Sequence, residues 1–227
     1  MNGYTSLKLL LFCLTLLINV PVYSQRVKII EPDLIKLMDS KKVKSVNRNI
    51  VLLTDTVYKN GIHLDERNDA GLAWLQHIKF SNGTIEFDVR GKDVMQQSFV
   101  GIAFHGLNDS TYNAVYFRPF NFKSPDVTRR RHSIQYIAMP LYDWPKLREE
   151  HPNKYEDSIH MAPEPNDWFH VSVVIQSPTV SVYVNRNKKA SLVVEKLDDF
   201  KNGMIGFWVG NGSAGDFANL KLTQMEE

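Results

Sequence analysis

The sequence is almost without cysteine. Its one cysteine among 227 residues, Cys13, lies inside an apolar N-terminal run, behind Leu11 and Phe12. A lipid anchor would need small residues directly before the cysteine, so we expect Cys13 to be discarded with this N-terminal segment. The mature chain then forms no disulfides, and in an oxidising compartment its core alone must hold the fold together.

A run of apolar residues long enough to cross a membrane is also missing. Residues 1–25 read MNGYTSLKLLLFCLTLLINVPVYSQ, with one lysine, a mostly apolar run from Leu9 to Val20, and small or polar residues after it. The run is too short to span a bilayer comfortably, and its layout is typical of a secretory signal peptide cleaved after Ser24. The sequence therefore predicts a secreted or periplasmic protein, residues 25–227, without a membrane span.

The chain has no excess of charge of either sign. It carries 27 lysine and arginine residues against 25 aspartate and glutamate residues, and Lys8 is the only charged residue of the predicted leader. A nearly neutral chain gives no electrostatic reason to expect nucleic acid or an anionic membrane as a partner.

The sequence also lacks the common catalytic and metal-binding motifs. It contains no His-Glu-x-x-His, no Gly-x-Ser-x-Gly and no phosphate-binding glycine loop, and its seven histidines show no ligand spacing. Asp216 with Asn211 would offer calcium two loop oxygens, whereas the ion takes six to eight. We therefore predict no cofactor and no metal site, and only weak calcium binding stays open.

What the sequence does contain is a repeated alternation of apolar and polar residues. In TIEFDVR, the apolar Ile85, Phe87 and Val89 alternate with polar residues, which indicates a strand with one buried face. The pattern returns in SFVGIAFHG, YNAVYFR, HSIQYIAM, FHVSVVIQ, TVSVYVN, ASLVVEKL, GMIGFWVG and FANLKL. Turn signals separate these segments and no helical pattern is interleaved, so we predict an all-β chain, an antiparallel two-sheet β-sandwich or jelly roll.

Two segments do not fit this alternation. EPDLIKLMDSKK is predicted to form a short helix, and residues 143–157, DWPKLREEHPNKYED, form a long charged insertion with two prolines. The basic run at residues 129–131 is predicted to lie in a solvated loop between strands. Without repeats or low-complexity tracts, residues 25–227 are predicted to form a single domain.

Several of these segments resemble the concanavalin A-like lectin/glucanase superfamily, which includes laminin G-like modules and family 16 glycoside hydrolases. The resemblance rests on FSNGTIEFDVRG, VSVYVNRNKKASLVVEKL, GMIGFWVG and GDFANLKL, and spans roughly residues 50–224. It looks close to bacterial secreted domains described as 3-keto-disaccharide hydrolase-like, or domain of unknown function 1080. It implies a concanavalin A-like sandwich that handles carbohydrate.

The catalytic strand of the family 16 enzymes, Glu-x-Asp-x-x-Glu, is not matched here. The nearest string, EFDVRG, has Gly91 where the last glutamate should stand. Glu86 and Asp88 nevertheless share one face of a strand, about 7 Å apart, so with His105 they are the candidate acid/base residues. The alternative for the two carboxylates is pairing with Arg90 or with a neighbouring strand, and for His105 a hydrogen bond at a strand end.

The phase of the strands predicts a groove on the outer face of one sheet. If Val115 and Phe117 point into the core, Tyr116 and Arg118 point away from it. The same reasoning places His105, Gln135 and Trp208 outward beside the small residues Gly101 and Ala103, and the insertion adds Trp144 and Arg148 as a lid. Aromatic rings can stack on sugar C–H faces, and a guanidinium fork suits vicinal hydroxyls. The predicted ligand-binding residues are His105, Tyr116, Arg118, Gln135, Trp144, Arg148 and Trp208.

These observations favour a glycan-binding module with a carbohydrate partner. The alternatives are a glycoside hydrolase or 3-keto-disaccharide hydrolase-like enzyme, in which Arg118 would orient the substrate, and a domain that recognises protein. For each residue there is also an ordinary structural explanation. Tyr116 and Trp208 would then be sheet packing, and Arg118 would form a surface ion pair with Glu86 or Asp88. The identity of the glycan, catalysis and the oligomeric state are not predicted.

Overall fold

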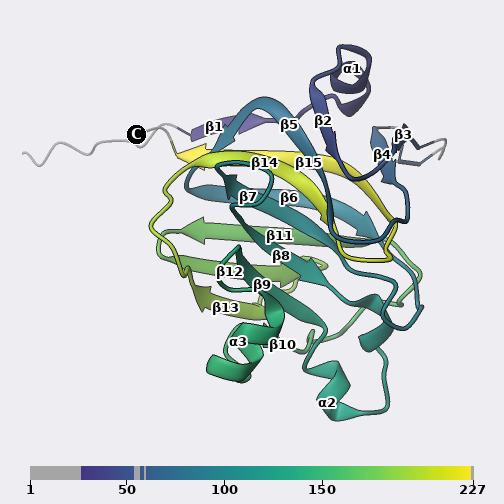
Figure 1. Ribbon diagram of the computed structural model, residues 1–227, viewed down its shortest axis with the longest axis vertical. Helices are drawn as coiled ribbons and strands as arrows, with labels where there is room; N and C mark the ends of the chain where they lie inside the picture. The colour runs from purple at the N-terminus through teal and green to yellow at the C-terminus, as the bar shows by residue number, and fades with distance from the viewer. Residues whose placement is uncertain (1–26, 54–56, 59, 226–227) are drawn as a thin grey trace, which may run out of the picture.

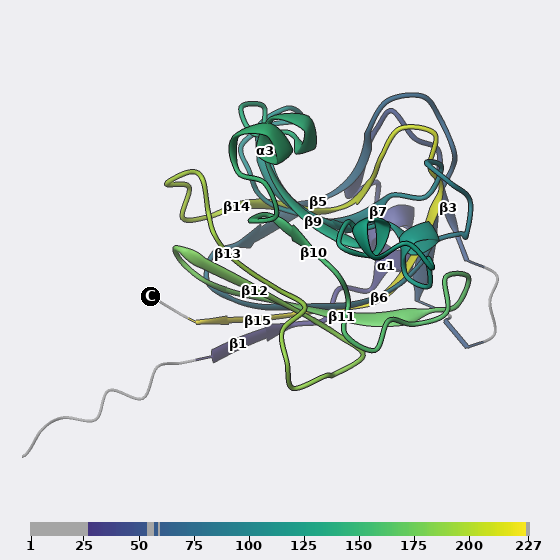
Figure 2. The same cartoon turned by 90° about the horizontal axis from the view of Figure 1, so that it is seen from below.

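Two antiparallel β-sheets packed face to face form the molecule (Figures 1 and 2). The computed structural model describes residues 27–53, 57–58 and 60–225, so the predicted signal peptide lies outside the described residues. The all-β, two-sheet antiparallel sandwich predicted from the alternating pattern is therefore confirmed. None of the helices in the described ranges has the length and apolar character needed to cross a membrane.

One sheet has eight strands. In spatial order these are β13 (Leu192–Glu195), β12 (Thr179–Val184), β11 (Phe169–Gln176), β6 (Gly83–Arg90), β15 (Gly215–Met225), β4 (Gly61–Leu64) and β3 (Ile50–Leu52), with β1 (Val27–Ile30) paired to β15. The other sheet has seven strands. Their order is β10 (Glu156–Asp157), β9 (Ile134–Met139), β8 (Tyr112–Phe117), β7 (Val100–Gly106), β14 (Gly203–Val209), β5 (Gly71–Phe80) and β2 (Val43–Val46).

All nine predicted strands are present, as β6 to β9 and β11 to β15. The predicted N-terminal helix is also present as α1 (Leu34–Asp39), where Asp33 caps the first turn by accepting from the backbone N–H of Lys36. One expectation needs correction, because the basic run lies partly in a short helix, α2 (Val127–Arg130). The insertion, for which no element was predicted, contains α3 (Trp144–Glu150) and the edge strand β10.

The core lies between the two sheets, and the alternation in the sequence decides which side chains enter it. Ile85, Phe87 and Val89 of β6 are fully buried, as are Val115 and Phe117 of β8. Phe117 packs edge-on against Phe169 of β11 and Phe87 against Phe207 of β14, with ring centroids 5.2 Å and 6.3 Å apart. The predicted inward orientation of Val115 and Phe117 is confirmed.

The outer face of the seven-stranded sheet is not left bare. In Figure 2, α3 lies beyond this sheet, on the side away from the eight-stranded sheet. A 3₁₀ turn (Pro119–Asn121) and α2 follow β8 and add further cover at one end. Pro119 ends β8 because it has no N–H to donate to the ladder, as predicted. With these additions around it, the outer face of the sheet becomes the floor of a pocket.

Candidate functional site

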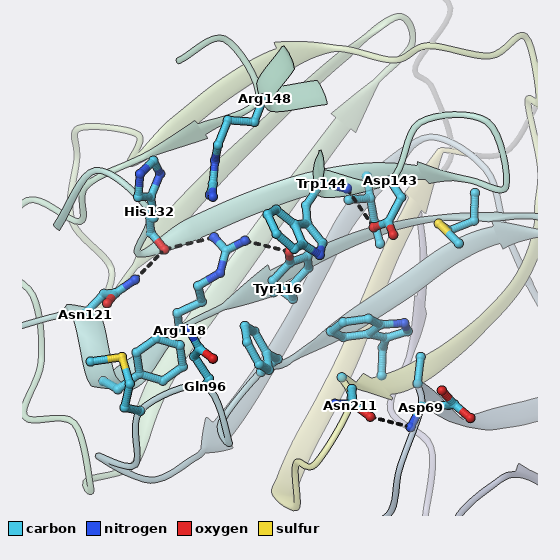
Figure 3. Close-up of a pocket in the computed structure, with 18 of the residues that line it drawn as sticks. Asp69, Gln96, Tyr116, Arg118, Asn121, His132, Asp143, Trp144, Arg148 and Asn211 are labelled. Atoms are coloured by element: carbon cyan, nitrogen blue, oxygen red, sulfur yellow. Dashed lines mark hydrogen bonds between the residues drawn. The ribbon is translucent and has the colours of Figure 1, made fainter. Parts of the chain in front are cut away.

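A pocket of about 670 Å³ opens on the outer face of the seven-stranded sheet (Figure 3). Its lining combines two kinds of side chain. The aromatic residues are Phe99, Tyr112, Tyr116, Phe120, Trp144 and Trp208. The titratable and basic residues are Asp69, Arg118, Arg129, His132, Asp143 and Arg148. This mixture of apolar surface with a few convergent polar groups is typical of a small-molecule site.

Tyr116 and Trp208 lie on the floor of the pocket. They come from β8 and β14, on either side of β7, where both residues are in register with Gly101. A Cβ atom at position 101 would approach Cβ of Tyr116 to 2.7 Å, so only glycine fits between them. The two rings lie 4.7 Å apart with a 30° tilt, and Nε1 of Trp208 donates to Oη of Tyr112. The floor is thus a pre-organised aromatic surface.

Arg118 continues the same face at the end of β8. Its Nη1 donates to the carbonyl of His132 at 2.9 Å, and its Nη2 donates to Oη of Tyr116 at 2.8 Å. The guanidinium lies 4.9 Å above the centre of the Tyr116 ring and is only 5 % exposed. Arg118 is therefore a buried member of the pocket floor, and the alternative explanation, a surface ion pair with Glu86 or Asp88, is wrong.

Burial raises the pKa of Tyr116 to about 12, so its hydroxyl keeps its proton at neutral pH. Since the oxygen already accepts from Arg118, the proton can be donated to an acceptor in the pocket.

A buried carboxylate holds the basic side of the pocket together. Glu156 of β10 receives two hydrogen bonds from Arg148, of 2.9 Å and 2.6 Å, and its Oε2 lies 2.7 Å from Nδ1 of His132 and 3.8 Å from Nη1 of Arg118. Burial of Glu156 opposes its ionisation, but the hydrogen bonds and charge of Arg148, with the charges of His132 and Arg118, lower its pKa. Sequence reasoning missed Glu156, because its two-residue strand carries no periodic signal.

Trp144 reaches the pocket from the insertion, at the first turn of α3. The helix begins there because Asp143 accepts from the backbone N–H of Trp144 and Pro145 favours the first helical positions. One turn later, the guanidinium of Arg148 lies 5.0 Å above the Trp144 ring. Trp144 is 43 % exposed, so it forms a wall that a ligand can contact directly.

The opposite end of the pocket carries Asp69 and Asn211, on two loops that one buried arginine joins (Figure 3). Nη2 of Arg48 donates to the carbonyls of Asp69 and Gly210, at 2.7 Å and 2.8 Å. Oδ1 of Asn211 in turn accepts from the backbone N–H of Asp69. Arg48 thus positions this rim without lining the pocket.

We expect Arg48→Met to destabilise the protein by at least about 2 kcal/mol, because the carbonyls of Asp69 and Gly210 each lose a hydrogen bond from a charged donor. Urea denaturation monitored by tryptophan fluorescence measures the change. Arg67→Met is the control, because this half-exposed arginine pairs with Asp65 at the surface and its loss is expected to change stability by less than about 1 kcal/mol. Equal effects in the two variants would contradict the role given to Arg48.

Two predicted ligand-binding residues do not line the pocket. Gln135 faces the predicted side but lies behind Arg118, with Nε2 donating to the carbonyls of Tyr136 and Tyr155. His105 is fully buried and lies 2.9 Å from the carbonyl of Ser81, and its burial lowers its pKa. Its φ of 50° and a register shift between β7 and β14 break the alternation there, so extrapolating the phase along β7 failed at His105.

The other candidate acid/base residues lie on the eight-stranded sheet and do not line the pocket. Asp88 pairs with His170 at 2.7 Å and accepts from Asn219, while Glu86 lies 3.4 Å from Lys221. Pairing with neighbouring strands, the alternative considered for these carboxylates, is therefore what the structure shows.

The possible calcium ligands are also separated. The carboxylate of Asp216 contacts His63 and Arg90, at 2.6 Å and 2.7 Å, and Asn211 belongs to the pocket rim. Within the described residues, no group of three or more His, Cys, Asp or Glu side chains is placed to hold a metal ion.

Comparison with solved structures gives the fold its context. A carbohydrate-binding module, CBM66 from Bacillus subtilis, superposes with a TM-score of 0.53 at 13 % identity, covering 80 % of this chain and 95 % of that one. A Bacillus subtilis protein of unknown function with a galectin-like fold gives 0.56 at 12 % identity, covering 86 % and 94 %. The carbohydrate recognition domain of Emp46p, in metal-free form, gives 0.53 at 11 % identity, covering 85 % and 94 %.

No protein-family model matches the chain, and no curated protein matches its sequence. At such low identities the structural likeness establishes the fold alone. The chain has the concanavalin A-like sandwich fold that occurs in carbohydrate-binding modules and lectin domains.

Proposed function

We propose that this protein binds a carbohydrate in the pocket on the outer face of the seven-stranded sheet. The observation that carries the proposal is the convergence of Tyr116, Trp208 and Trp144 with the guanidinium of Arg118 in one pocket. A pyranose ring has apolar C–H faces and a rim of hydroxyls, which match aromatic walls beside fixed donors. Known carbohydrate-binding domains of the same fold support this choice.

The rigidity of the floor favours binding. Tyr116, Trp208 and Tyr112 are tied together by stacking and a hydrogen bond, and Arg118 is fixed by His132 and Tyr116. A ligand therefore has few side chains to immobilise on binding, which lowers the entropic cost of association.

Trp144→Ala is expected to weaken binding of a responsive glycan by at least about tenfold, or 1.4 kcal/mol, while leaving the fold intact. A glycan array with purified residues 25–227 identifies the glycan, and isothermal titration calorimetry measures the affinity. Trp144 is not part of the buried core, so removing its side chain leaves the core intact.

Met161→Ala is the control for an exposed apolar side chain, because Met161 is exposed and does not line the pocket. Its affinity is expected to stay within about twofold of the wild type. If the glycan binds equally well to both variants, the binding site lies elsewhere.

The enzymatic alternative has one observation in its favour, because two carboxylates, Asp69 and Asp143, line the same pocket. Glycoside hydrolysis uses one carboxyl group as acid and a second as nucleophile or base. Glu86, Asp88 and His105, which were the predicted catalytic candidates, are outside this pocket. A reducing-sugar assay that shows turnover in the wild type and none in Asp143→Asn would establish an enzyme, whereas binding without turnover supports a lectin-like module.

The finer assignments are part of the proposal. We infer that the chain is exported, with residues 1–24 removed, and that its relatives are the secreted 3-keto-disaccharide hydrolase-like and laminin G-like domains. N-terminal sequencing of the protein from its native host should find Gln25 first. Retention of Met1 would contradict export.

A further inference from the structure

We propose that the pocket takes a saccharide bearing an anionic group, a carboxylate or a sulfate ester, bound between Arg118 and Arg129. This inference rests on the proposed carbohydrate-binding function and adds the chemical class of the ligand. The sequence as a whole is nearly neutral and does not indicate an anionic ligand, because the basic and acidic side chains of the pocket are separated only in the folded protein.

The first argument is the balance of charge on one side of the pocket. Three guanidinium groups line it, those of Arg118, Arg129 and Arg148, and arginine stays protonated at any physiological pH. The carboxylate of Glu156 lies behind them and takes two hydrogen bonds from Arg148. One carboxylate therefore pairs with more than one cation, and this side of the pocket has a net positive charge.

Arg129 is the cation with the least compensation. Its Nε donates to Oδ1 of Asn121, and its Nη2 donates to the carbonyl of Phe120 and contacts the sulfur of Met95. These partners are all neutral. Among the described residues, no carboxylate lies within ion-pair distance of Arg129.

The second argument is that the acidic residues of the pocket lie elsewhere. In Figure 3, Asp69 with Asn211 and Asp143 are separated from Arg118, His132 and Asn121 by the rings of Trp144 and Tyr116. A ligand that lies across the rings therefore meets a basic side and an acidic side. Its hydroxyls can donate to the carboxylates, while an anionic group faces the guanidiniums.

A partly buried cation is strongly attracted to a counter-ion, because the surrounding apolar side chains weaken solvent screening. The planar fork of arginine presents two parallel N–H groups, a spacing that matches the oxygens of a carboxylate or a sulfate. A neutral saccharide would leave the basic side of the pocket uncompensated. An anionic saccharide supplies the missing counter-charge.

Matched pairs of ligands test this inference by calorimetry. Short glucuronate, galacturonate and mannuronate oligosaccharides are each compared with their carboxyl-reduced neutral counterparts, and sulfated oligosaccharides with their desulfated counterparts. We expect the anionic member of a recognised pair to bind at least about tenfold more tightly at low salt, and the ratio to fall as ionic strength rises. Preference in the uronate pairs identifies a carboxylate, and preference in the sulfated pairs identifies a sulfate ester.

Arg129→Gln is expected to reduce this ratio to less than about threefold. Arg130→Gln is the matched control, because Arg130 follows directly in the chain, donates to the carbonyl of Ser124 and does not line the pocket. It removes the same net charge and should leave the ratio unchanged. Arg129 is only half-buried, so its variant is expected to fold, which thermal denaturation verifies.

The outcomes separate the two proposals. If neutral saccharides bind as tightly as their anionic partners, and Trp144→Ala weakens this binding, the carbohydrate-binding function stands and the anionic preference is wrong. If Arg130→Gln reduces the ratio as much as Arg129→Gln, the preference arises from overall charge, and the assigned site is wrong. If the folded protein binds no saccharide of either kind, both proposals are wrong.

Discussion

Phe117→Ala is expected to destabilise the fold by about 3–5 kcal/mol, the usual range for truncating a buried aromatic side chain. Phe117 is fully buried between the sheets and packs edge-on against Phe169 of the opposite sheet, with ring centroids 5.2 Å apart. Phe122 also packs against Phe169, with ring centroids 5.3 Å apart. Removing Phe117 leaves a cavity where β8, β11 and the segment after β8 meet.

The change in the free energy of unfolding is measured by urea denaturation at neutral pH. Val193→Ala is the control, since Val193 is an exposed apolar residue of β13 and its truncation is expected to change stability by less than about 0.5 kcal/mol. A loss for Phe117→Ala as small as that for Val193→Ala would show that the ring does not bridge the two sheets.

Alternation in the sequence predicted most of this sandwich because one face of many strands is apolar. The five N-terminal strands, β1 to β5, were not predicted. In β5 the consecutive residues Leu72, Ala73, Trp74 and Leu75 are all buried, because neighbouring groups cover both faces of this strand. Such a strand has no period of two, and a single sequence does not distinguish it from a buried helix.

The same reasoning predicted the candidate site in part. The phase of β8 and β14 correctly placed Tyr116, Arg118 and Trp208 on one face, and the structure brings Trp144 and Arg148 to the same pocket. Period two assigns a side chain to a face of a sheet, but it does not say what covers that face. Arg118 was therefore correctly placed on the outer face, but the sequence did not indicate that His132 and Glu156 would cover it there.

Glu156 shows this limit most clearly. Its partners Arg118, His132 and Arg148 lie directly after β8, just before β9 and in α3, and these groups meet only when the insertion folds back over the sheet edge. Their separation along the chain follows no motif. A buried carboxylate that pairs with several cations exists only in the folded structure. Its removal is therefore expected to destabilise the protein strongly.

Glu156→Gln is expected to destabilise the protein by about 3–5 kcal/mol at neutral pH, because the variant leaves the buried charge of Arg118 and the partly buried charge of Arg148 without a counter-charge. Glutamine keeps the shape of the side chain, so the loss reports charge and hydrogen bonding rather than a cavity. The matched control is Glu164→Gln. Glu164 is an exposed carboxylate paired with Lys123, and its change is expected to stay below about 1 kcal/mol.

The pH dependence provides a second, independent readout for Glu156. Its pKa is lower in the folded protein than the usual 4.5, so its ionisation contributes stability that is fully present above that value and is lost as the pH falls through the folded pKa. The difference in unfolding free energy between the wild type and Glu156→Gln should therefore be present at about pH 5 and shrink in more acidic solution. Urea denaturation at a series of pH values measures this difference. A gap that persists undiminished below the folded pKa would mean that ionisation of Glu156 does not cause the loss in Glu156→Gln, and would contradict its role as the counter-charge of Arg118 and Arg148.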